Sequence, residues 1–445
     1  MDIIDKVLKF CFILSILFLI FILGFLSNDL KINRVYEGIS FIINDIETRL
    51  NINLQKKFGD IDARNTLTLD NKQGINSNFD FYNKPKKAFK HYLLIKHDLT
   101  QPVLMDTPDR VIWTWDLSKF RNQSKMIALH LFDNGDLLLG KFHYKGIYRI
   151  NKFGDILWSN PGLNHHWVDV ENEKIFIPSR KFMSLPSDLN SNLANSELKN
   201  CNNKKSAFDT ILILDSKNGK TLKNLSLMEK LIKNEEFKKI LNEKLVNDTN
   251  GDICKDPLHL NDIQKLTQNE INLINSKISL TSNNIVILSF RNIDMVLFYD
   301  LDNNVINHIV VDLFKKQHSP RLHKDGYLYV FDNNDYSSVN SEIVKIDLQN
   351  NKIINSFMSK NFASPVQGRI QFLNDELFVQ SSSQGEIFKV NCKNDFFEDC
   401  KPEYIYSSNF SFFYPSNHYD SSNSFKKDRF HIGDFYEKDK LNFIN

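Results

Sequence analysis

A repeated pair of short strands is the feature that most constrains the fold of this chain. Apolar stretches alternate with Asn/Asp/Gly turns, a pattern typical of half-buried strands joined by tight turns. The unit recurs at about 40 to 50 residues, which is the period of four-stranded propeller blades. Its first strand pairs are "LFDNGDLLLG", "VENEKIFIP", "TSNNIVILSF", "LHKDGYLYVFDN" and "FLNDELFVQ". A second strand pair follows each of them, as in "GIYRINKFGDILW" after the first.

The two ends of the repeat region complete a ring in this interpretation. "RVIWTWDL", Arg110 to Leu117, can be assembled with the C-terminal strands into a sixth blade. Two stacked sheets are the alternative, but a sandwich would not repeat this unit so evenly. The chain is therefore predicted to be all-β, with a six-bladed β-propeller over residues 88–445.

One long gap interrupts the period. Between "NEKIFIP" and "NNIVILSF" we predict a partly helical insertion at about residues 184–278. Its middle, "SLMEKLIKNEEFKKILNEKLV", opens with Ser226 and Glu229, which have the spacing of a capping box. Loops at one end of a propeller channel are where such a fold builds sites, and the insertion leads into such a loop.

The N-terminal segment predicts a membrane anchor. Val7–Leu26 contains one charge, Lys9, and is about as long as a helix that spans a bilayer. No small-residue cleavage site follows, which favours an uncleaved anchor over residues 1–27, with a cleaved signal peptide as the alternative. The remaining chain is expected outside the cytoplasm, on the periplasmic side of the inner membrane in a Gram-negative bacterium.

Residues 28–87 are predicted to be a spacer between this anchor and the propeller. Apolar residues recur at helical spacing from Gly38 to Leu54, which predicts a stalk helix. A polar linker then continues to about Lys87.

Cysteine usage agrees with export. Cys11 lies in the predicted anchor, which leaves four cysteines, an even number in an exported domain. Cys392 and Cys400 bracket "KNDFFED", a short loop that one disulfide could close, and Cys201 with Cys254 would then close the insertion. Four cysteines allow three connectivities, and this is one of them.

Polar residues that can carry chemistry stand at corresponding places in successive blades. In "DPLHLNDIQ", His259 and Asn261 are two apart, a spacing that points both side chains to one face of a strand. The other candidates are His165 and His166 in "NHHWVDV", Arg291 in "SFRNID" and His318 in "KKQHSPRL". Inner strands of a propeller line its channel, so these side chains are expected to converge.

The segments "HHWVDV", "DPLHLND", "SFRNID" and "QHSPRLHKDGYLYVFDN" together resemble the bacterial arylsulfotransferase family, also called arylsulfate sulfotransferases. The resemblance covers most of the chain after about Arg110. It implies a six-bladed propeller that moves a sulfuryl group from one phenol to another without a nucleotide donor.

The resemblance also implies a role for each motif. His318 matches the sulfated nucleophile, and Arg291 matches the arginine that grips the sulfuryl oxygens. His259 and Asn261 match an H-x-N pair near the phenolic oxygen. Neutral imidazole can carry a sulfuryl group covalently, and a guanidinium offers a fork of donors. A protonated histidine helps a phenolate to leave and can then deprotonate the incoming phenol.

The double histidine matches a further channel histidine of the family. Either His165 or His166 is the substrate-binding residue at this place. Trp167 directly follows the pair, and the acidic residue comes only at Asp169. This differs from the common family pattern, so the sequence does not decide which of the two histidines aligns with the family's histidine.

The expected reaction is sulfuryl transfer from an aryl sulfate ester to a phenol through a sulfohistidine, with no cofactor. The alternative is a catalytically silent envelope propeller that scaffolds partners or binds anionic ligands. No HExxH or CxxC spacing supports a metal site at these histidines. The 56 Lys+Arg and 54 Asp+Glu are nearly balanced, so no basic surface argues for nucleic acid as a partner.

Overall fold

The computed structural model divides the chain into two compact units, 1–68 and 69–445, and the residues that it describes all lie in the second. These residues are 79–80, 90–95, 102–107, 110–120, 126–141, 145–183, 206–246, 256–334, 340–359, 362–364, 367–382, 386–392, 397, 399–408 and 433–444. The predicted anchor and stalk lie outside them, as do Cys11, Cys201 and Cys254. Within these ranges, no helix has the length and apolar character needed to span a membrane.

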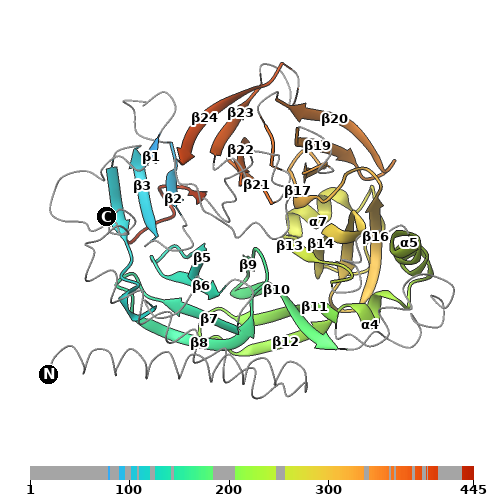
Figure 1. The fold of residues 1–445 in the computed structure, drawn as a ribbon, viewed down its shortest axis with the longest axis horizontal. Coiled ribbons are helices and arrows are strands. Elements are labelled where there is room, and N and C mark those ends of the chain that lie inside the picture. Colours follow the sequence, from blue (N-terminus) through green and yellow to red (C-terminus); the bar gives the residue numbers. More distant parts are fainter. Residues whose placement is uncertain are drawn as a thin grey trace, which may run out of the picture. The chain divides into compact units, whose positions relative to one another are not determined.

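Six antiparallel sheets stand around a common centre, as Figure 1 shows. We number them as blades 1 to 6 and give the strands of each from the inside outward. Blade 1 consists of β25 (Gly433–Tyr436), β2 (Tyr92–Ile95), β3 (Val103–Thr107) and β4 (Arg110–Thr114). Blade 2 consists of β5 (Met126–Leu131), β6 (Leu137–Lys141), β7 (Lys145–Ile150) and β8 (Ile156–Leu163). Blade 3 consists of β9 (Asp169–Glu171), β10 (Lys174–Met183), β11 (Ser206–Asp215) and β12 (Thr221–Ser226). Blade 4 consists of β13 (Leu260–Lys265), β14 (Ile285–Phe290), β15 (Met295–Asp300) and β16 (Val305–Val311). Blade 5 consists of β17 (His318–Leu322), β18 (Leu328–Asp332), β19 (Glu342–Asp347) and β20 (Lys352–Met358). Blade 6 consists of β21 (Arg369–Leu373), β22 (Glu376–Ser381), β23 (Glu386–Asn391), β24 (Lys401–Ser408) and β1 (Phe79–Asp80). The predicted six-bladed propeller is confirmed.

The first blade is built from both ends of this unit. The C-terminal strand β25 pairs with β2, with Tyr436 opposite Tyr92, and becomes the inner strand of blade 1. The outer strand of the same blade is β4, which begins the segment Arg110 to Leu117. The predicted sixth blade, and with it the closure of the ring, is therefore confirmed.

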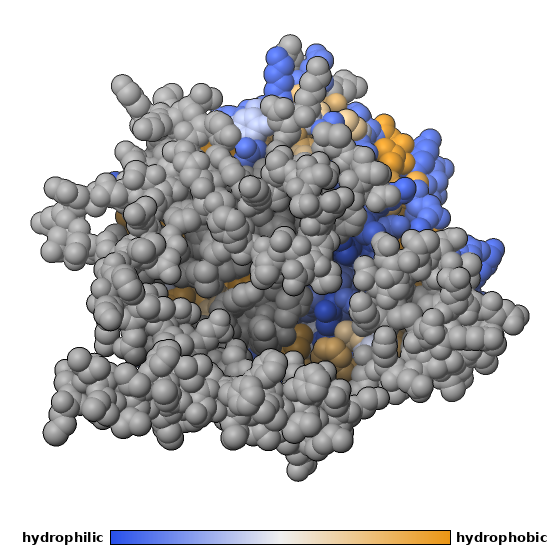
Figure 2. All heavy atoms as spheres, in the orientation of Figure 1, coloured by the Kyte–Doolittle hydropathy of each residue, from blue (hydrophilic) through white to orange (hydrophobic). Residues whose placement is uncertain are grey.

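The apolar cores lie between blades. Every residue of β14, "IVILSF", and of β15, "MVLFYD", is buried. Both faces of these middle strands are covered by neighbouring blades, which is why their sequences are nearly continuous apolar runs. The outer strand β20 is different: Ile353, Ile354 and Met358 are exposed on it. Figure 2 shows a hydrophobic spot among hydrophilic residues at the upper right, where Figure 1 draws β20.

Ion pairs join the inner strands of adjacent blades. Arg321 of β17 contacts both carboxylate oxygens of Asp262 on β13, at 3.1 and 3.2 Å. Arg369 of β21 contacts both oxygens of Asp434 on β25, at 2.7 and 2.8 Å. The two aspartates are almost fully buried, so each needs its arginine to offset the loss of hydration. These pairs fix the inner strands of blades 4 and 5, and of blades 6 and 1, relative to each other.

The predicted insertion at 184–278 is corrected, because it contains three propeller strands. β11, β12 and β13 all lie within that range and belong to blades 3 and 4. Between β12 and β13 the described helices are α4 (Met228–Leu231) and α5 (Glu235–Val246), with α5 beside β16 at the outer edge (Figure 1). The helix α7 (Gln268–Ile274) connects β13 to β14 inside blade 4. The strands flanking these short helices are therefore parts of the blades rather than of an insertion.

The predicted capping box at Ser226 and Glu229 is wrong. Ser226 is the last residue of β12 and is paired in the sheet, so the N-cap of α4 is Leu227, which makes no side-chain cap. The capping box belongs to α7. The Thr267 side chain accepts from the backbone N–H of Glu270, and the Glu270 carboxylate accepts from the backbone N–H of Thr267.

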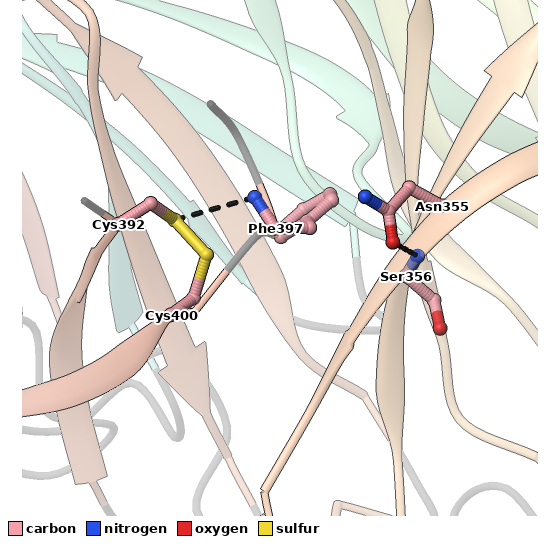
Figure 3. Close-up of a disulfide and its surroundings, with 5 residues drawn as sticks. All are labelled: Asn355, Ser356, Cys392, Phe397 and Cys400. Atoms are coloured by element: carbon pink, nitrogen blue, oxygen red, sulfur yellow. Dashed lines mark hydrogen bonds between the residues drawn. A yellow bond between two sulfur atoms is a disulfide. The ribbon is translucent and has the colours of Figure 1, made fainter. Parts of the chain in front are cut away.

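The predicted disulfide between Cys392 and Cys400 is confirmed. The two Cα atoms lie 4.1 Å apart at the β23–β24 connection. Figure 3 shows Phe397 inside the closed loop, where its backbone N–H donates to Sγ of Cys392 at 3.3 Å. The Phe397 ring packs against Tyr329 and Phe357 of blade 5, with ring centroids 5.5 and 6.1 Å apart. The disulfide therefore holds an aromatic side chain in the core between blades 5 and 6.

We expect the Cys392→Ser, Cys400→Ser double variant to unfold more easily than the parent. Cross-linked residues 8 apart restrict the unfolded chain by an amount worth about 2.5 kcal/mol. Urea unfolding of the parent with and without reductant should give a lower midpoint in the reduced sample, close to that of the double variant. If reduction leaves the midpoint of the parent unchanged, the disulfide does not stabilise the propeller.

Candidate active site

The sequence-predicted residues gather at one end of blades 3 to 5. His165 and His166 precede the inner strand β9, His259 precedes the inner strand β13, and His318 opens the inner strand β17. Arg291 directly follows β14, in the turn η3 (Arg291–Ile293). Because β13 and β14 are antiparallel, the start of one meets the end of the other, and Leu260 pairs with Phe290. This is why Arg291 and His259 reach the same end.

The backbone leaves regular strand geometry at two of these places. His259 has φ 57°, and Ser319, next to His318, has φ 49°. The ladders of β13 with β14 and of β17 with β18 both shift register here. Left-handed conformations are uncommon for residues other than glycine, and bulges re-aim side chains at the ends of strands. The same-face argument for His259 and Asn261 therefore fails, since His259 lies before the strand.

Four imidazole rings form one cluster. Ring centroids are 4.2 Å apart for His165 and His166, and 4.9 Å apart for His165 and His259. The His166 ring lies 5.1 Å from that of His259 and 6.2 Å from that of His318. Both members of the double histidine therefore belong to the cluster, and the expectation that one of them binds substrate stays a prediction.

The hydrogen bonds of His318 determine its tautomer. Its Nδ1 lies 2.6 Å from Oδ1 of Asn333 and 3.1 Å from the carbonyl oxygen of Lys316. The Asn333 Nδ2 donates to the carbonyl oxygens of Ser364 and Gln367, each at 2.5 Å, which assigns Oδ1 as the acceptor. Two acceptors at Nδ1 require a proton on that atom. The Nε2 atom of neutral His318 then carries the lone pair.

The charge state of His318 is set by burial and by Arg291. Burial lowers the pKa of His318 to about 3, with the Arg291 charge acting in the same direction and the Asn333 hydrogen bond opposing both. The residue is only 3% exposed. At neutral pH it is uncharged, as a nitrogen nucleophile must be.

His259 is held by a carboxylate and a guanidinium. Its Nδ1 lies 2.6 Å from Oδ2 of Asp256, the same oxygen that Nη2 of Arg180 contacts. Nη2 of Arg180 also lies 3.1 Å from this Nδ1 and can only donate, but the carboxylate is closer and favours a proton on Nδ1, which leaves the lone pair on Nε2. That Nε2 lies 3.1 Å from Nε2 of His166, so the shared proton of this contact belongs to His166.

A second buried acid supports the same arginine. Asp209 of β11 is fully buried, accepts the backbone N–H of Leu260 at 3.0 Å and lies 3.7 Å from Nε of Arg180. Burial raises the pKa of Asp209, and the neighbouring Asp256 raises it further. For Asp256, burial opposes ionisation, but His259 and Arg180 together hold its pKa below the usual range. Asp209 and Asp256 therefore hold Arg180 between them, and Asp256 with Arg180 orients the imidazole of His259.

The resting His259 is neutral rather than protonated. Burial lowers the pKa of His259 to about 4, although Asp256 acts to raise it. The sequence-based expectation was a protonated histidine that assists the departure of a phenol. The neutral ring, with Nε2 ready to accept a proton, is the form that can deprotonate the incoming phenol. It is favoured because the ring is desolvated and Arg180 and Arg291 add positive charge nearby.

Asn261 has a different place from the one predicted. Its Nδ2 donates to the carbonyl oxygen of Gln317 at 2.6 Å, and the residue is fully buried. It therefore ties β13 to the residue before His318. Its Nδ2 thus makes a positioning contact, and the predicted contact of Asn261 with substrate stays a prediction. Its Oδ1 has no hydrogen-bond partner among the described residues.

Sequence reasoning missed Arg180, Asp256 and Asn333. Asp256 stands three residues before His259 in "DPLH", and Asn333 closes "VFDN", so both were within quoted motifs. Arg180 lies on β10, in a different blade, and nothing local marks it. Sequence spacing also could not reveal that His165, His166 and His259 present potential ligand atoms within 4.8 Å of one another, because they come from two blades.

Residues 190–399 match the family model described as Arylsulfotransferase (ASST). The predicted resemblance to this family is thereby confirmed over that part of the chain. The match includes Asp256, His259, Arg291, His318 and Asn333, and it begins after His165 and His166. No curated protein matches the chain.

Several solved structures show a distant likeness. Sqt1 of Saccharomyces cerevisiae is 9% identical, with 76% of this chain and 89% of that chain covered and a TM-score of 0.41. A protein of unknown function from Bacteroides caccae is 12% identical over 68% of this chain and 90% of that chain, with a TM-score of 0.39. A functionally unknown protein from Desulfotomaculum acetoxidans is 8% identical over 71% and 78%, with a TM-score of 0.39. At these TM-scores the likenesses carry no argument about function.

Proposed function

We propose that the chain is an arylsulfotransferase that moves a sulfuryl group from an aryl sulfate ester to a phenol through a sulfohistidine at His318. One observation carries the proposal. Two hydrogen-bond acceptors fix the proton of His318 on Nδ1, so that Nε2 is an unprotonated nucleophile beside the charge of Arg291 and the rings of the histidine cluster. The match to the arylsulfotransferase family model supports the same reaction class.

In the first half-reaction, Nε2 of His318 attacks the sulfur of the donor. The S–N bond forms as the S–O bond to the aryl group breaks, and the phenol oxygen leaves with the bonding electron pair. The sulfated imidazole carries a positive ring charge with its proton still on Nδ1. The oxygens of Asn333 and Lys316 accept that N–H and stabilise the charge.

In the second half-reaction, a phenol oxygen attacks the same sulfur and the S–N bond breaks toward His318. The phenol proton goes to Nε2 of His259, which is unprotonated because Asp256 holds the proton of that ring on Nδ1. In the first half-reaction the same path runs in reverse: a His259 ring that carries a second proton on Nε2, left by the previous acceptor or taken from water, gives it to the departing phenol. A donor that meets the neutral ring releases its phenolate unprotonated. Arg291 offers a planar set of donors to the sulfuryl oxygens as charge spreads over them.

The experiment that tests this function uses the full-length protein, an aryl sulfate with a chromogenic phenol and a second phenol as acceptor. We expect release of the chromogenic phenol and formation of the acceptor's sulfate ester in equal amounts, without a nucleotide. Release without a sulfated acceptor would indicate a hydrolase. No release with any aryl sulfate would favour the silent propeller that binds anions or partners.

We expect Arg291→Lys to lower kcat by roughly 10- to 100-fold. An ammonium keeps the charge but cannot reproduce parallel donors, and one lost donor to a developing oxyanion costs on the order of 10²- to 10³-fold. Steady-state kinetics would measure the effect, with Arg110→Lys at an exposed position as the matched control. An Arg291→Lys protein with the parent's kcat would remove Arg291 from the mechanism.

We also propose that the propeller works outside the cytoplasm, tethered by Val7–Leu26. The Cys392–Cys400 disulfide supports this placement, since such bonds persist in oxidising compartments. Protease treatment of intact spheroplasts should degrade the propeller and spare a cytoplasmic marker. Protection of the propeller until the cells are lysed would place it inside the cytoplasm.

A further inference from the structure

We propose that His165, His166 and His259 form a binding site for a borderline divalent transition-metal ion of the zinc class. The three residues present ligand atoms that all lie within 4.8 Å of one another. Imidazole nitrogen is a preferred ligand of Zn²⁺, Co²⁺ and Cu²⁺, and three protein ligands with an open fourth position form a recurring zinc geometry.

The distances suit such an ion. Zn–N bonds of about 2.0–2.1 Å in a tetrahedral site separate two ligand nitrogens by about 3.3 Å. The Nε2 atoms of His166 and His259 are already 3.1 Å apart, facing each other. All the ligand atoms lie within 4.8 Å of one another, so the widest separation has to shorten by at most about 1.5 Å to reach that value.

The backbone directs two adjacent histidines to the same place. Neighbouring residues of a strand point to opposite faces, yet the rings of His165 and His166 are only 4.2 Å apart. The segment lies between β8 and β9, and the backbone N–H of His165 donates to the carbonyl oxygen of Pro178 on β10 at 2.9 Å. Both rings are buried, so their approach is part of the fold rather than a surface contact.

The surroundings of His259 resemble the outer shell of a metal site. A metal-bound histidine usually donates its other ring N–H to a carboxylate, which fixes the tautomer and raises the basicity of the ligand. The Nδ1 of His259 makes this contact with Oδ2 of Asp256 at 2.6 Å, and Nη2 of Arg180 contacts the same oxygen. A catalytic base requires the same arrangement, so the Nε2 atom of His259 can accept either a proton or a metal ion.

The two uses exclude each other. A metal ion on Nε2 of His259 occupies the lone pair that receives the phenol proton. Bound metal should therefore inhibit sulfuryl transfer, a consequence that rests on the proposed function, whereas metal binding itself does not.

The test is a titration of the chelator-stripped full-length protein with Co²⁺, followed by displacement with Zn²⁺. We expect one Co²⁺ per chain with the intense visible absorption of a four-coordinate ion. His165→Ala and His166→Ala should each raise the dissociation constant more than about 100-fold, because loss of an outer-shell partner alone costs about 10- to 100-fold. Asp256→Asn should fall in that smaller range.

Two control variants show whether the bound Co²⁺ lies at these three histidines. His318→Ala keeps all three ligands and should bind Co²⁺ as the parent does, although it cannot turn over. His308→Ala removes a histidine on β16, outside the cluster, and should change neither binding nor turnover. Failure to bind, or binding that survives His165→Ala and His166→Ala, would overturn the proposal. Co²⁺ binding in a protein without sulfuryl transfer would overturn the proposed function alone.

Discussion

His318→Ala is expected to abolish sulfuryl transfer, with both half-reactions lost. The residue provides the only atom to which the proposed mechanism attaches the sulfuryl group, so its removal leaves no covalent route. Alanine also removes the ring whose Nδ1–H bridges Asn333 and Lys316, but the backbone pairing of β17 with β18 does not depend on it. The chromogenic assay measures the effect, with circular dichroism to verify the fold.

His308→Ala is the matched control for this variant. His308 lies on β16, the outermost strand of blade 4, and its Nε2 contacts Oδ1 of Asn351 at 3.2 Å. It is not part of the histidine cluster, which lies at the inner strands. Its replacement should leave kcat at the parent value. A His318→Ala protein that turns over at the parent rate would show that another residue carries the sulfuryl group.

His259→Ala is expected to lower turnover by roughly 10²- to 10⁴-fold with unactivated phenols, the usual contribution of general acid–base catalysis. The loss should depend on the leaving group. A phenol with a pKa of about 10 needs a proton to depart, whereas a nitrophenolate leaves without one. The loss in the donor half-reaction should therefore be much smaller with a nitrophenyl sulfate than with phenyl sulfate.

Single-turnover measurements on the two donors would isolate that half-reaction. Asp256→Asn is the comparison variant, since it retains the ring of His259 but removes the carboxylate that orients it. It should show the same leaving-group trend with a smaller amplitude. Equal losses for both donors in His259→Ala would assign the residue to binding rather than to proton transfer.

The fold was predictable because the repeat is local. Each blade shows its strands and turns within about 40 to 50 residues, and the closure by the C-terminal strand follows from a blade that is otherwise short of a strand. The helical insertion was harder to predict. The capping signal at Ser226 is misleading because this residue pairs in β12, while Thr267 and Glu270 form the real box. Strand pairing outweighs a local helix signal there.

The site was predictable only as a set of residues. The motifs located His318, His259 and Arg291, because each stands beside a recognisable strand. Their geometry depends on the left-handed backbone conformation of His259 and on bulges in the β13–β14 and β17–β18 pairs. No sequence pattern indicates either feature. Asp256 and Asn333 lie near their histidines in the sequence, whereas Arg180, whose charge lowers the pKa of His259, comes from another blade. The sequence suggested that His259 exchanges a proton with the phenol, but it did not indicate that burial makes the resting ring neutral.

The position of the covalent intermediate is the most direct test of the central claim. The full-length protein is mixed with an aryl sulfate in the absence of acceptor, quenched within the first turnover, digested and analysed by peptide mass spectrometry under conditions that preserve N-sulfuryl groups. We expect one sulfuryl group per chain on the peptide that contains His318, and its loss on addition of a phenol. A sulfuryl group on another residue, or none while phenol is released in a burst, would contradict the assignment of His318 as the nucleophile.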